Sequence, residues 1–468
     1  MKTHTLTMLL VALVSAAVVE GPAAGAKPAT GPLRVCPTNR RYFAGPDGKA
    51  VYLTGAHTWN NLVDIGASDP PPRFDYPKYL DFLAKNNHNF IRLWTWESVT
   101  WNTKRNGRNA ILRAAPHPWA RTGQGKAADG KPKFDLDKFN AEYFRRLRQR
   151  VAAAQKRGIY VSVMLFEGWA MQFSAGAWTG HPFHRANNVN GINGDANRDG
   201  KGLEIHTLTG KPVTRVQEAY VRKVIDTVND LDNVLYEISN ENHPASTEWQ
   251  AHVIDLIHRA EKAKPKQHPV GMTFQYRGGS NKTLFASPAD WVSPNPSGGW
   301  RDNPPAADGG KVVITDTDHL WGIGGNRSWV WKSFLRGANP IFMDPYRGVV
   351  LSRGADTTWQ PIRQSMGHTL NYARRMNLTA MTPQGKLASS GYCLARAAGN
   401  AEYLVYVPRG RPVTVDLSAA SSELAVEWFD VAKGKVAGGK AVRGGAKRTL
   451  TPPFRGEAVL YLRSRKGL

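Results

Sequence analysis

The stretch 233-NVLYEISNENH-243 decides which fold class this chain can adopt. It begins with the apolar run 234–236, which is typical of a strand buried on both faces of a parallel sheet. Asn240, Glu241 and His243 follow, so a polar cluster lies at the carboxyl end of the strand. Parallel α/β barrels build their active sites at that end. The stretch therefore predicts a parallel α/β fold with functional side chains at this strand tip.

Seven other segments alternate with helical patterns in the same way, which argues for a parallel α/β fold. A doubly wound sheet would give a similar pattern. Polar residues follow almost every strand, however, as a barrel site built from many strand ends requires. We therefore predict a (β/α)8 TIM barrel over residues 51–380. Its strands are expected at 51–55, 89–94, 159–166, 233–240, 270–274, 290–293, 311–315 and 340–344, with helices at about 75–86, 135–157, 217–229, 247–263, 328–336 and 357–376.

Residues 383–468 differ in character from the barrel region. Short apolar strands separated by Gly, Pro and Ser turns predict a C-terminal antiparallel β-sandwich. Residues 27–50 form a lead-in with a hairpin at Asp47-Gly48, because Asp-Gly is a strong turn signal. The sandwich strands are expected at 403–407, 413–417, 425–429 and 458–462.

The first 26 residues have the pattern of a secretory signal peptide. Lys2 and His4 precede an apolar run at 8–19, and Ala24-Gly25-Ala26 fits the cleavage rule. The run is too short for a comfortable membrane span, and no later apolar stretch is long enough. We expect a secreted protein without a membrane span. Such a compartment permits a disulfide between Cys36 and Cys393, and two separate buried thiols are the alternative.

The formal net charge is +25, which favours acidic partners such as an anionic polysaccharide. The basic residues are spread along the whole chain, so a solvated basic surface explains the charge equally well. No specific nucleic-acid-binding motif occurs. The 15 Trp residues point more directly to sugars, because aromatic faces stack on sugar rings, although many Trp residues will be ordinary core.

Several motifs resemble those of known glycoside hydrolases. Asn240-Glu241 at the tip of the fourth strand resembles the acid/base motif of retaining (β/α)8 glycosidases of the cellulase-like clan. The stretch RRYFAGPDGKAVYLTGAHTWNNL (40–62) resembles the opening of apiosidase-like barrels in bacterial secreted proteins. Three C-terminal stretches resemble the β-domain, often named collagen-binding, that follows those barrels: SGYCLAR (390–396), EYLVYVPRG (402–410) and VEWFDVAKGK (426–435).

The resemblance implies a catalytic pair of carboxyl groups. It makes Glu241 the acid/base and Asn240 a contact to the sugar 2-hydroxyl. These families usually show a second Glu at the tip of the seventh strand, but here the sequence reads VITDTDH, with Asp316 and Asp318. Either Asp could be the nucleophile, and a structural role for Asp318 is an equal alternative. Arg92 matches the Arg that keeps the nucleophile ionised, with Glu237 as a candidate partner on the fourth strand.

Other side chains at strand tips are candidates for binding sugar, and ordinary packing is the alternative for each. They are His57, Trp59, Trp94, Glu167, Trp169, His243, Gln275, Tyr276, His319 and Trp321. A catalytic metal is not favoured, because no H-x-H pair opens the first strand. Its candidate ligands would be His57, His243, Asp316, Asp318 and His319.

The loop containing Asp195, Asn197 and Asp199 has the D-x-N-x-D-G spacing of a calcium loop. The twelfth position is His206 instead of Glu, so an EF-hand is rejected. Glu204 could complete a structural Ca²⁺ site, and a loop of Asx turns is the alternative.

The sequence therefore predicts a secreted glycoside hydrolase that cleaves O-glycosidic bonds of a poly- or oligosaccharide by a two-carboxylate, retaining mechanism. The alternative is an inactive carbohydrate-binding surface protein on a barrel scaffold, which the missing Glu of the seventh strand would fit. No cofactor for catalysis is expected.

Overall fold

The computed structural model describes residues 27–102, 111–346 and 356–465, so the predicted signal peptide lies outside the described residues. Eight parallel strands form the central sheet in the order β4-β16-β15-β14-β13-β12-β11-β6. The two end strands face each other, and the backbone N–H of Asn89 donates to Thr54 O across the remaining gap at 3.0 Å. The predicted TIM barrel is confirmed. Its strands are β4 (Gly55–His57), β6 (Phe90–Leu93), β11 (Tyr160–Glu167), β12 (Val234–Asn240), β13 (Val270–Thr273), β14 (Trp291–Ser293), β15 (Val312–Asp316) and β16 (Asn339–Met343).

The first barrel strand lies later in the chain than predicted. Ala50 and Val51 belong to β3 of an N-terminal three-stranded antiparallel sheet, β1 (Arg34–Val35), β2 (Phe43–Ala44) and β3 (Ala50–Val51). The intervening backbone is held by side chains instead of a strand ladder. Asn339 Oδ1 accepts from Leu53 N at 3.0 Å, and Asn89 Oδ1 accepts from Thr54 N at 2.9 Å.

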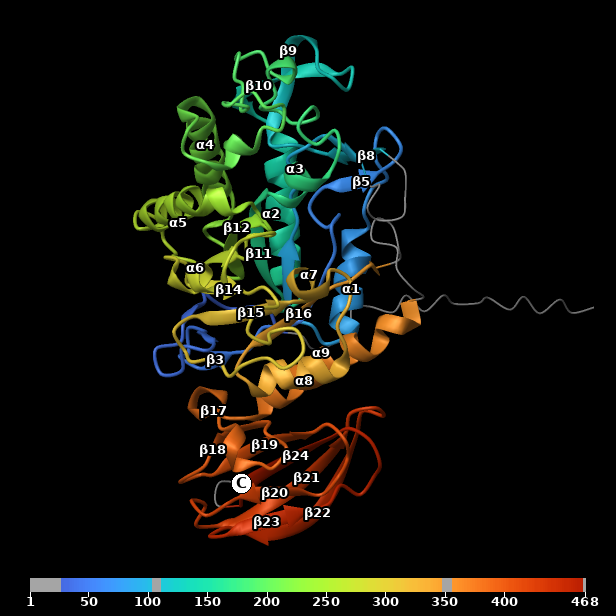
Figure 1. The fold of residues 1–468 in the computed structure, drawn as a ribbon, viewed down its shortest axis with the longest axis vertical. Helices are drawn as coiled ribbons and strands as arrows, with labels where there is room; N and C mark the ends of the chain where they lie inside the picture. Colours follow the sequence, from blue (N-terminus) through green and yellow to red (C-terminus); the bar gives the residue numbers. More distant parts are fainter. Residues whose placement is uncertain (1–26, 103–110, 347–355, 466–468) are drawn as a thin grey trace, which may run out of the picture.

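Amphipathic helices cover the barrel (Figure 1). In α1, Asp75 caps the first turn by accepting from Lys78 N, and Tyr79, Leu80 and Leu83 lie on the buried face. The α-helices are α1 (Tyr76–Lys85), α2 (Ala141–Gln155), α3 (Trp169–Phe173), α4 (Lys211–Val228), α5 (Thr247–Glu261), α6 (Asn281–Ala286), α7 (Thr317–Trp321), α8 (Arg327–Leu335) and α9 (Gln360–Arg375). Short 3-10 turns are η2 (Arg185–Asn187), η3 (Leu203–His206), η4 (Pro244–Ser246), η6 (Asp356–Trp359), η7 (Leu378–Ala380) and η8 (Gly385–Leu387).

The segment after β6 contains β-structure that the sequence analysis treated as loop and helix. The helix predicted from residue 135 begins only at Ala141, because residues 132–139 form β10 (Pro132–Phe139), which pairs antiparallel with β9 (Trp119–Lys126). Asn140 ends this ribbon and caps α2. A second small sheet combines β5 (Asp64–Gly66), β8 (Ile111–Ala115) and β7 (Thr100–Asn102). The ribbon projects at the end of the molecule opposite the C-terminal strands (Figure 1).

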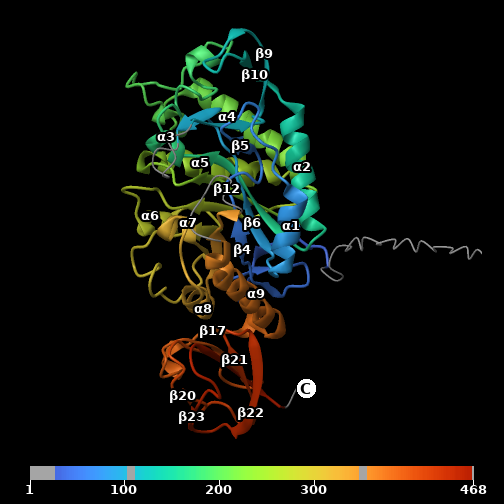
Figure 2. The ribbon, with the colours of Figure 1, turned by 90° about the vertical axis from the view of Figure 1, so that its right-hand side faces the viewer.

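The C-terminal strands form the predicted antiparallel β-sandwich, which packs on α8 and α9 (Figure 2). One face of its six-stranded sheet shares an apolar cluster with these helices, where Phe429 lies 5.8 Å from both Trp331 and Tyr372 between ring centroids. The other face packs against β20 and β23. The six strands are β17 (Thr382–Pro383), β18 (Cys393–Arg396), β19 (Glu402–Val407), β24 (Ala458–Ser464), β21 (Glu423–Asp430) and β22 (Lys435–Arg443); the pair is β20 (Val413–Asp416) and β23 (Lys447–Leu450).

Cys36 and Cys393 form no disulfide; both are free and buried, which is the second of the two alternatives. Cys36 Sγ lies 3.4 Å from Thr38 Oγ1 beside the N-terminal sheet, whereas Cys393 belongs to the apolar core inside the sandwich. The two thiols therefore lie in separate buried regions of the protein. Within the described part of the chain, no helix is both long enough and apolar enough to cross a membrane.

Candidate active site

Arg92 connects four of the residues that the barrel brings together at the carboxyl ends of its strands. Its Nε donates to Glu237 Oε2 at 2.9 Å, and its Nη2 donates to Asn240 Oδ1 at 2.6 Å. Its Nη1 donates to Asp316 Oδ2 at 2.8 Å and to Asp318 Oδ2 at 3.2 Å. A buried guanidinium needs such carboxylate partners to offset its lost hydration. Arg92 therefore fixes the positions of the strand-four and strand-seven polar groups relative to each other.

The backbone at Glu241 explains how two consecutive residues both line the site. Strict alternation along a strand would place Asn240 and Glu241 on opposite faces. However, β12 ends at Asn240, and Glu241 adopts a left-handed conformation with φ of 44°. Thr273 Oγ1 accepts from Glu241 N at 3.3 Å, and Gln172 Nε2 donates to Glu241 O at 2.8 Å. Non-glycine residues rarely adopt this conformation, which concentrates at functional sites.

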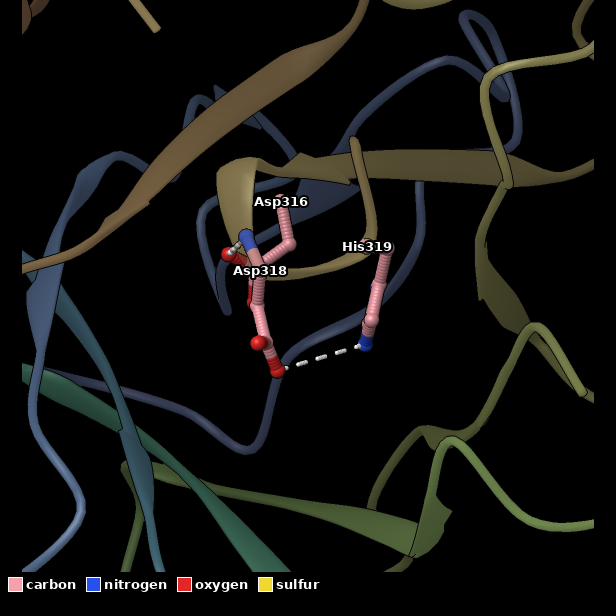
Figure 3. Close-up of side chains that lie close together, drawn as sticks. All are labelled: Asp316, Asp318 and His319. Atoms are coloured by element: carbon pink, nitrogen blue, oxygen red, sulfur yellow. Dashed lines mark hydrogen bonds and ion pairs between the residues drawn. The ribbon is translucent and has the colours of Figure 1, made fainter. Parts of the chain in front are cut away.

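The two strand-seven aspartates occupy different environments (Figure 3). The seventh strand ends at Asp316 and does not continue through Asp318. Asp316 is the last residue of β15 and caps α7, because its Oδ1 accepts from Asp318 N at 2.9 Å. Asp316 is fully buried, whereas Asp318 extends from the first turn of α7 beside His319 (Figure 3). No described residue hydrogen-bonds to Asp318 Oδ1, so this oxygen is free to meet a ligand.

His57 completes the environment of Asp316. Trp94 Nε1 donates to His57 Nδ1 at 2.8 Å, and His57 Nε2 lies 3.0 Å from Asp316 Oδ1. Because an indole N–H can only donate, Nδ1 must be the acceptor and Nε2 must carry the proton. Burial alone would raise the pKa of Asp316, but His57 and Arg92 more than offset it and hold that pKa well below its usual value. The ionised form of Asp316 is therefore favoured at neutral pH.

A cavity of about 810 Å³ opens at this end of the barrel, within the 300–1,000 Å³ typical of ligand sites. Neither Arg92 nor Asp316 reaches its surface, and His57, His243 and Gln275 also lie outside its lining. The predicted site residues that line it are Trp59, Trp94, Glu167, Trp169, Asn240, Glu241, Tyr276, Asp318, His319 and Trp321.

Two of the residues outside the lining, His243 and Gln275, stabilise the turn after β12 through hydrogen bonds. His243 Nε2 lies 3.0 Å from Leu203 O. Gln275 Nε2 contacts several acceptors of the turn after β12, among them Thr247 Oγ1 at 2.9 Å and His243 O at 3.3 Å. Both side chains therefore position the strand-four turn and do not face the cavity.

Burial and nearby charges shift the pKa values of the two candidate catalytic carboxyls that line the cavity, Glu241 and Asp318, by different extents. Burial, followed by the nearby Asp318, raises the pKa of Glu241 well above its usual value, which favours its protonated form. Burial and Asp316 raise the pKa of Asp318 only to about 6, because Arg92 acts in the opposite direction. The cavity therefore combines a Glu241 that favours the protonated form with an Asp318 that is ionised above about pH 6, which is the arrangement that acid and nucleophile need.

Glu167 is a third acid in the cavity. Its Oε1 accepts from Trp169 N at 2.8 Å and its Oε2 from Ala170 N at 3.0 Å. Burial nevertheless raises the pKa of Glu167 to about 8. Behind it, Glu97 accepts from Glu167 N at 2.8 Å; burial opposes the ionisation of Glu97, but His206 offsets this and lowers its pKa to about 2.

Asp316, Asp318 and His319 place potential metal-ligating atoms within 4.8 Å of one another. Arg92 already contacts the Oδ2 atoms of both aspartates. Burial lowers the pKa of His319 to about 3, and its ring nitrogens contact Ser293 Oγ at 2.7 Å and Asn240 Oδ1 at 3.2 Å. A cation here would face the fixed charge of Arg92, so this cluster fits an ion-pair network better than a metal centre.

The loop predicted to bind calcium brings Asp195, Asp199 and Glu204 together, with potential ligand atoms within 4.8 Å of one another. Asn197 also joins it, because its Nδ2 donates to Glu204 Oε1 at 2.6 Å. Asp195 already accepts from Asp199 N at 3.1 Å and Gly200 N at 3.0 Å, which is the Asx-turn arrangement. Calcium binding stays a prediction.

Some residues of the cavity lining were not among the predicted site residues, notably Arg277 and Arg301, together with Phe274, Asn295 and Met343. Arg277 lies four residues after the end of β13 and has a positive φ of 55°, next to Gly278 and Gly279. The Gly-Gly pair after a strand end was the one local signal for an unusual turn. Nothing local marks Arg301, which lies in the long segment between β14 and β15.

Comparisons with known proteins agree with the barrel and the C-terminal domain. Residues 115–276 match the family model described as "Domain of unknown function (DUF6298)", and residues 385–460 match "Putative collagen-binding domain of a collagenase". No curated protein matches the chain.

Two similar solved structures cover nearly the whole chain. One, described as a glycoside hydrolase, has a TM-score of 0.62 at 14% identity and covers 94% of this chain and 98% of its own. A glycoside hydrolase family 5 structure from Bacteroides vulgatus ATCC 8482 has a TM-score of 0.60 at 14% identity, covering 93% of this chain and 94% of its own. At this identity the likeness establishes the fold, and the resemblance to glycosidase barrels is confirmed at that level. The narrower likeness to apiosidase-like proteins stays a prediction.

Proposed function

We propose that this protein is a glycoside hydrolase in which Glu241 is the general acid/base and Asp318 is the nucleophile. One observation carries the proposal: two carboxyl groups with opposite protonation preferences line one cavity at the carboxyl ends of the barrel strands. Glycoside hydrolysis by the two-carboxylate route needs this pair. Asp316, the first candidate from the sequence, is assigned to positioning because it is buried and fully hydrogen-bonded.

In the proposed retaining route, Glu241 donates its proton to the glycosidic oxygen while Asp318 Oδ1 attacks the anomeric carbon. The bond to the leaving group breaks, and a glycosyl ester with Asp318 forms. Glu241, now ionised, then removes a proton from water, which attacks the same carbon and releases Asp318. Arg92 stabilises the Asp318 carboxylate as a leaving group in the second step.

The aromatic lining fits a carbohydrate. Trp169, Tyr276 and Trp321 are half-buried in the cavity wall and offer ring faces for stacking against sugar. Asn240 is held by Arg92 and His319, so its amide nitrogen is free to donate to a sugar hydroxyl. We infer a poly- or oligosaccharide substrate outside the cytoplasm, in line with the predicted signal peptide.

The test is release of reducing sugar from a panel of plant, microbial and animal polysaccharides by wild type and Glu241→Gln. Glu248→Gln, an exposed glutamate of α5, is the matched control. We expect release by wild type and the control, and loss in Glu241→Gln. Polysaccharide binding with equal inactivity of all three proteins would contradict the proposal and favour a binding protein that has lost catalysis.

A further inference from the structure

The charged residues of the cavity fall into two groups with different positions in the fold. The acids Glu167, Glu241 and Asp318 come from the ends of the third, fourth and seventh strands. The arginines Arg277 and Arg301 come from the segments that follow β13 and β14, the fifth and sixth strands. Basic side chains therefore line one sector of the cavity wall, next to the sector that carries the candidate acid/base.

Arg277 is held in place without an acidic partner. Its guanidinium carbon lies 5.1 Å from the Phe173 ring centroid and 5.9 Å from that of Tyr276. None of the ion pairs among the described residues includes Arg277, and the side chain is exposed. Its left-handed backbone, with φ of 55°, is unusual for a residue with a side chain. The turn thus presents a stacked guanidinium whose N–H groups remain available to a ligand.

Arg301 adds a second positive charge to the same cavity. Its one ion pair among the described residues is an exposed contact with Asp302, in which Arg301 Nε lies 3.3 Å from Oδ1. Such surface pairs contribute little and exchange easily with a ligand.

In the cavity lining, two arginines accompany three acids whose pKa values are all raised. Burial raises the pKa of Glu167 to about 8 and that of Glu241 well above its usual value, so both favour the neutral form. Asp318, with a pKa of about 6, is the one acid of the lining that is mainly ionised. The two arginines therefore outweigh it. A neutral sugar would leave their charge without a partner, whereas an acidic sugar would supply one.

We propose that the cavity selects a glycan carrying a carboxylate or sulfate group, which Arg277 binds and Arg301 supports beside the fifth and sixth strands. This inference rests on the proposed function for the nature of the ligand as a sugar. Guanidinium groups form two parallel hydrogen bonds with anions that present two acceptor oxygens side by side, so Arg277 fits a carboxylate or sulfate better than a hydroxyl.

The test is calorimetric binding to the Glu241→Gln protein, in which turnover does not interfere. The probes are tetrasaccharides of galacturonate, glucuronate and mannuronate with their carboxyl-reduced counterparts, and a sulfated galactan tetrasaccharide with its desulfated form. We expect at least one acidic member to bind about tenfold tighter than its neutral counterpart. The pair that shows the difference identifies the acidic group.

Arg277→Gln should reduce this affinity about tenfold or more, whereas Arg277→Lys should restore part of it because the charge remains. Arg145→Gln, an exposed arginine of α2 outside the cavity, controls for the basic surface and should leave the affinity unchanged. Equal affinity for acidic and neutral members, no binding of any acidic member, or equal losses in Arg277→Gln and Arg145→Gln would each overturn the inference.

The outcomes also separate this inference from the proposed function. Turnover of a neutral glycan without preference for acid would overturn the acidic subsite and leave hydrolysis standing. Acid-selective binding by a wild-type protein that hydrolyses none of the glycans would support the acidic subsite and overturn the proposed hydrolysis.

Discussion

Trp94 Nε1 donates a 2.8 Å hydrogen bond to Nδ1 of His57, and this single contact sets the tautomer of the ring. The proton of His57 must lie on Nε2, where it is shared with Asp316. Asp316 in turn caps α7 and accepts from Arg92. The orientation of Asp318 thus depends on a chain of contacts that begins at a tryptophan of the second strand.

Replacement of His57 should therefore affect Asp318 indirectly. We expect His57→Ala to remove a buried donor from Asp316, lower the free energy of unfolding by about 1–3 kcal/mol, and reduce kcat more than it changes KM. Urea unfolding and steady-state kinetics check this. His252→Ala, at a half-exposed position of α5, is the control and should change neither quantity measurably. Wild-type kcat and stability in His57→Ala would contradict the positioning role.

A rescue experiment should distinguish the roles of Asp316 and Asp318. Asp318→Ala should lower kcat at least about a thousandfold, and azide should restore turnover with release of a glycosyl azide, because a small anion can occupy the space of the missing nucleophile. Asp316→Ala should lower activity and stability without rescue, since Asp316 lies behind the cavity wall. Product analysis by mass spectrometry decides between them, and rescue of Asp316→Ala alone would reverse the assignment.

The pH dependence of kcat/KM should be bell-shaped. Asp318 must be ionised, so activity should fall as the pH drops through about 6. Glu241 must be protonated, so activity should fall again as the pH rises through its raised pKa. With an aryl glycoside, whose leaving group needs no acid, Glu241→Gln should keep the acidic limb and lose the alkaline one. A profile for wild type without an acidic limb would contradict the role of Asp318.

Arg92 should matter more for folding than any exposed arginine. Arg92→Met would leave Glu237, Asp316 and Asp318 buried without their cationic partner, which should lower the free energy of unfolding by about 3–5 kcal/mol. Arg148→Met is the matched control, because Arg148 pairs with Asp230 at the surface and its loss should cost less than about 1 kcal/mol. Urea unfolding followed by tryptophan fluorescence measures both, and similar losses would contradict the central role of Arg92.

The sequence predicts the barrel well, because buried parallel strands are continuous apolar runs and their tips carry the polar residues. It predicts less about single side chains. Whether Asp316 or Asp318 faces the cavity depends on α7 starting at Thr317, which a strand pattern through VITDTDH does not reveal. Arg277 becomes part of the site through a left-handed turn, and the separation of Cys36 from Cys393 depends on domain packing. The pattern of apolar strands does not show such turns, helix starts and domain contacts.

The contact between the sandwich and the barrel limits how the two parts can work together. Phe429 and Tyr461 of the sandwich share an apolar cluster with α8 and α9, and Arg375 pairs with Glu427 at 2.7 Å across the same boundary. A domain joined by a flexible linker could bind a polymer at varying distances from the catalytic domain. Here any ligand-binding surface of the sandwich stays at a fixed distance from the cavity. A glycan that contacted both would therefore need a minimum length, which this fixed distance sets.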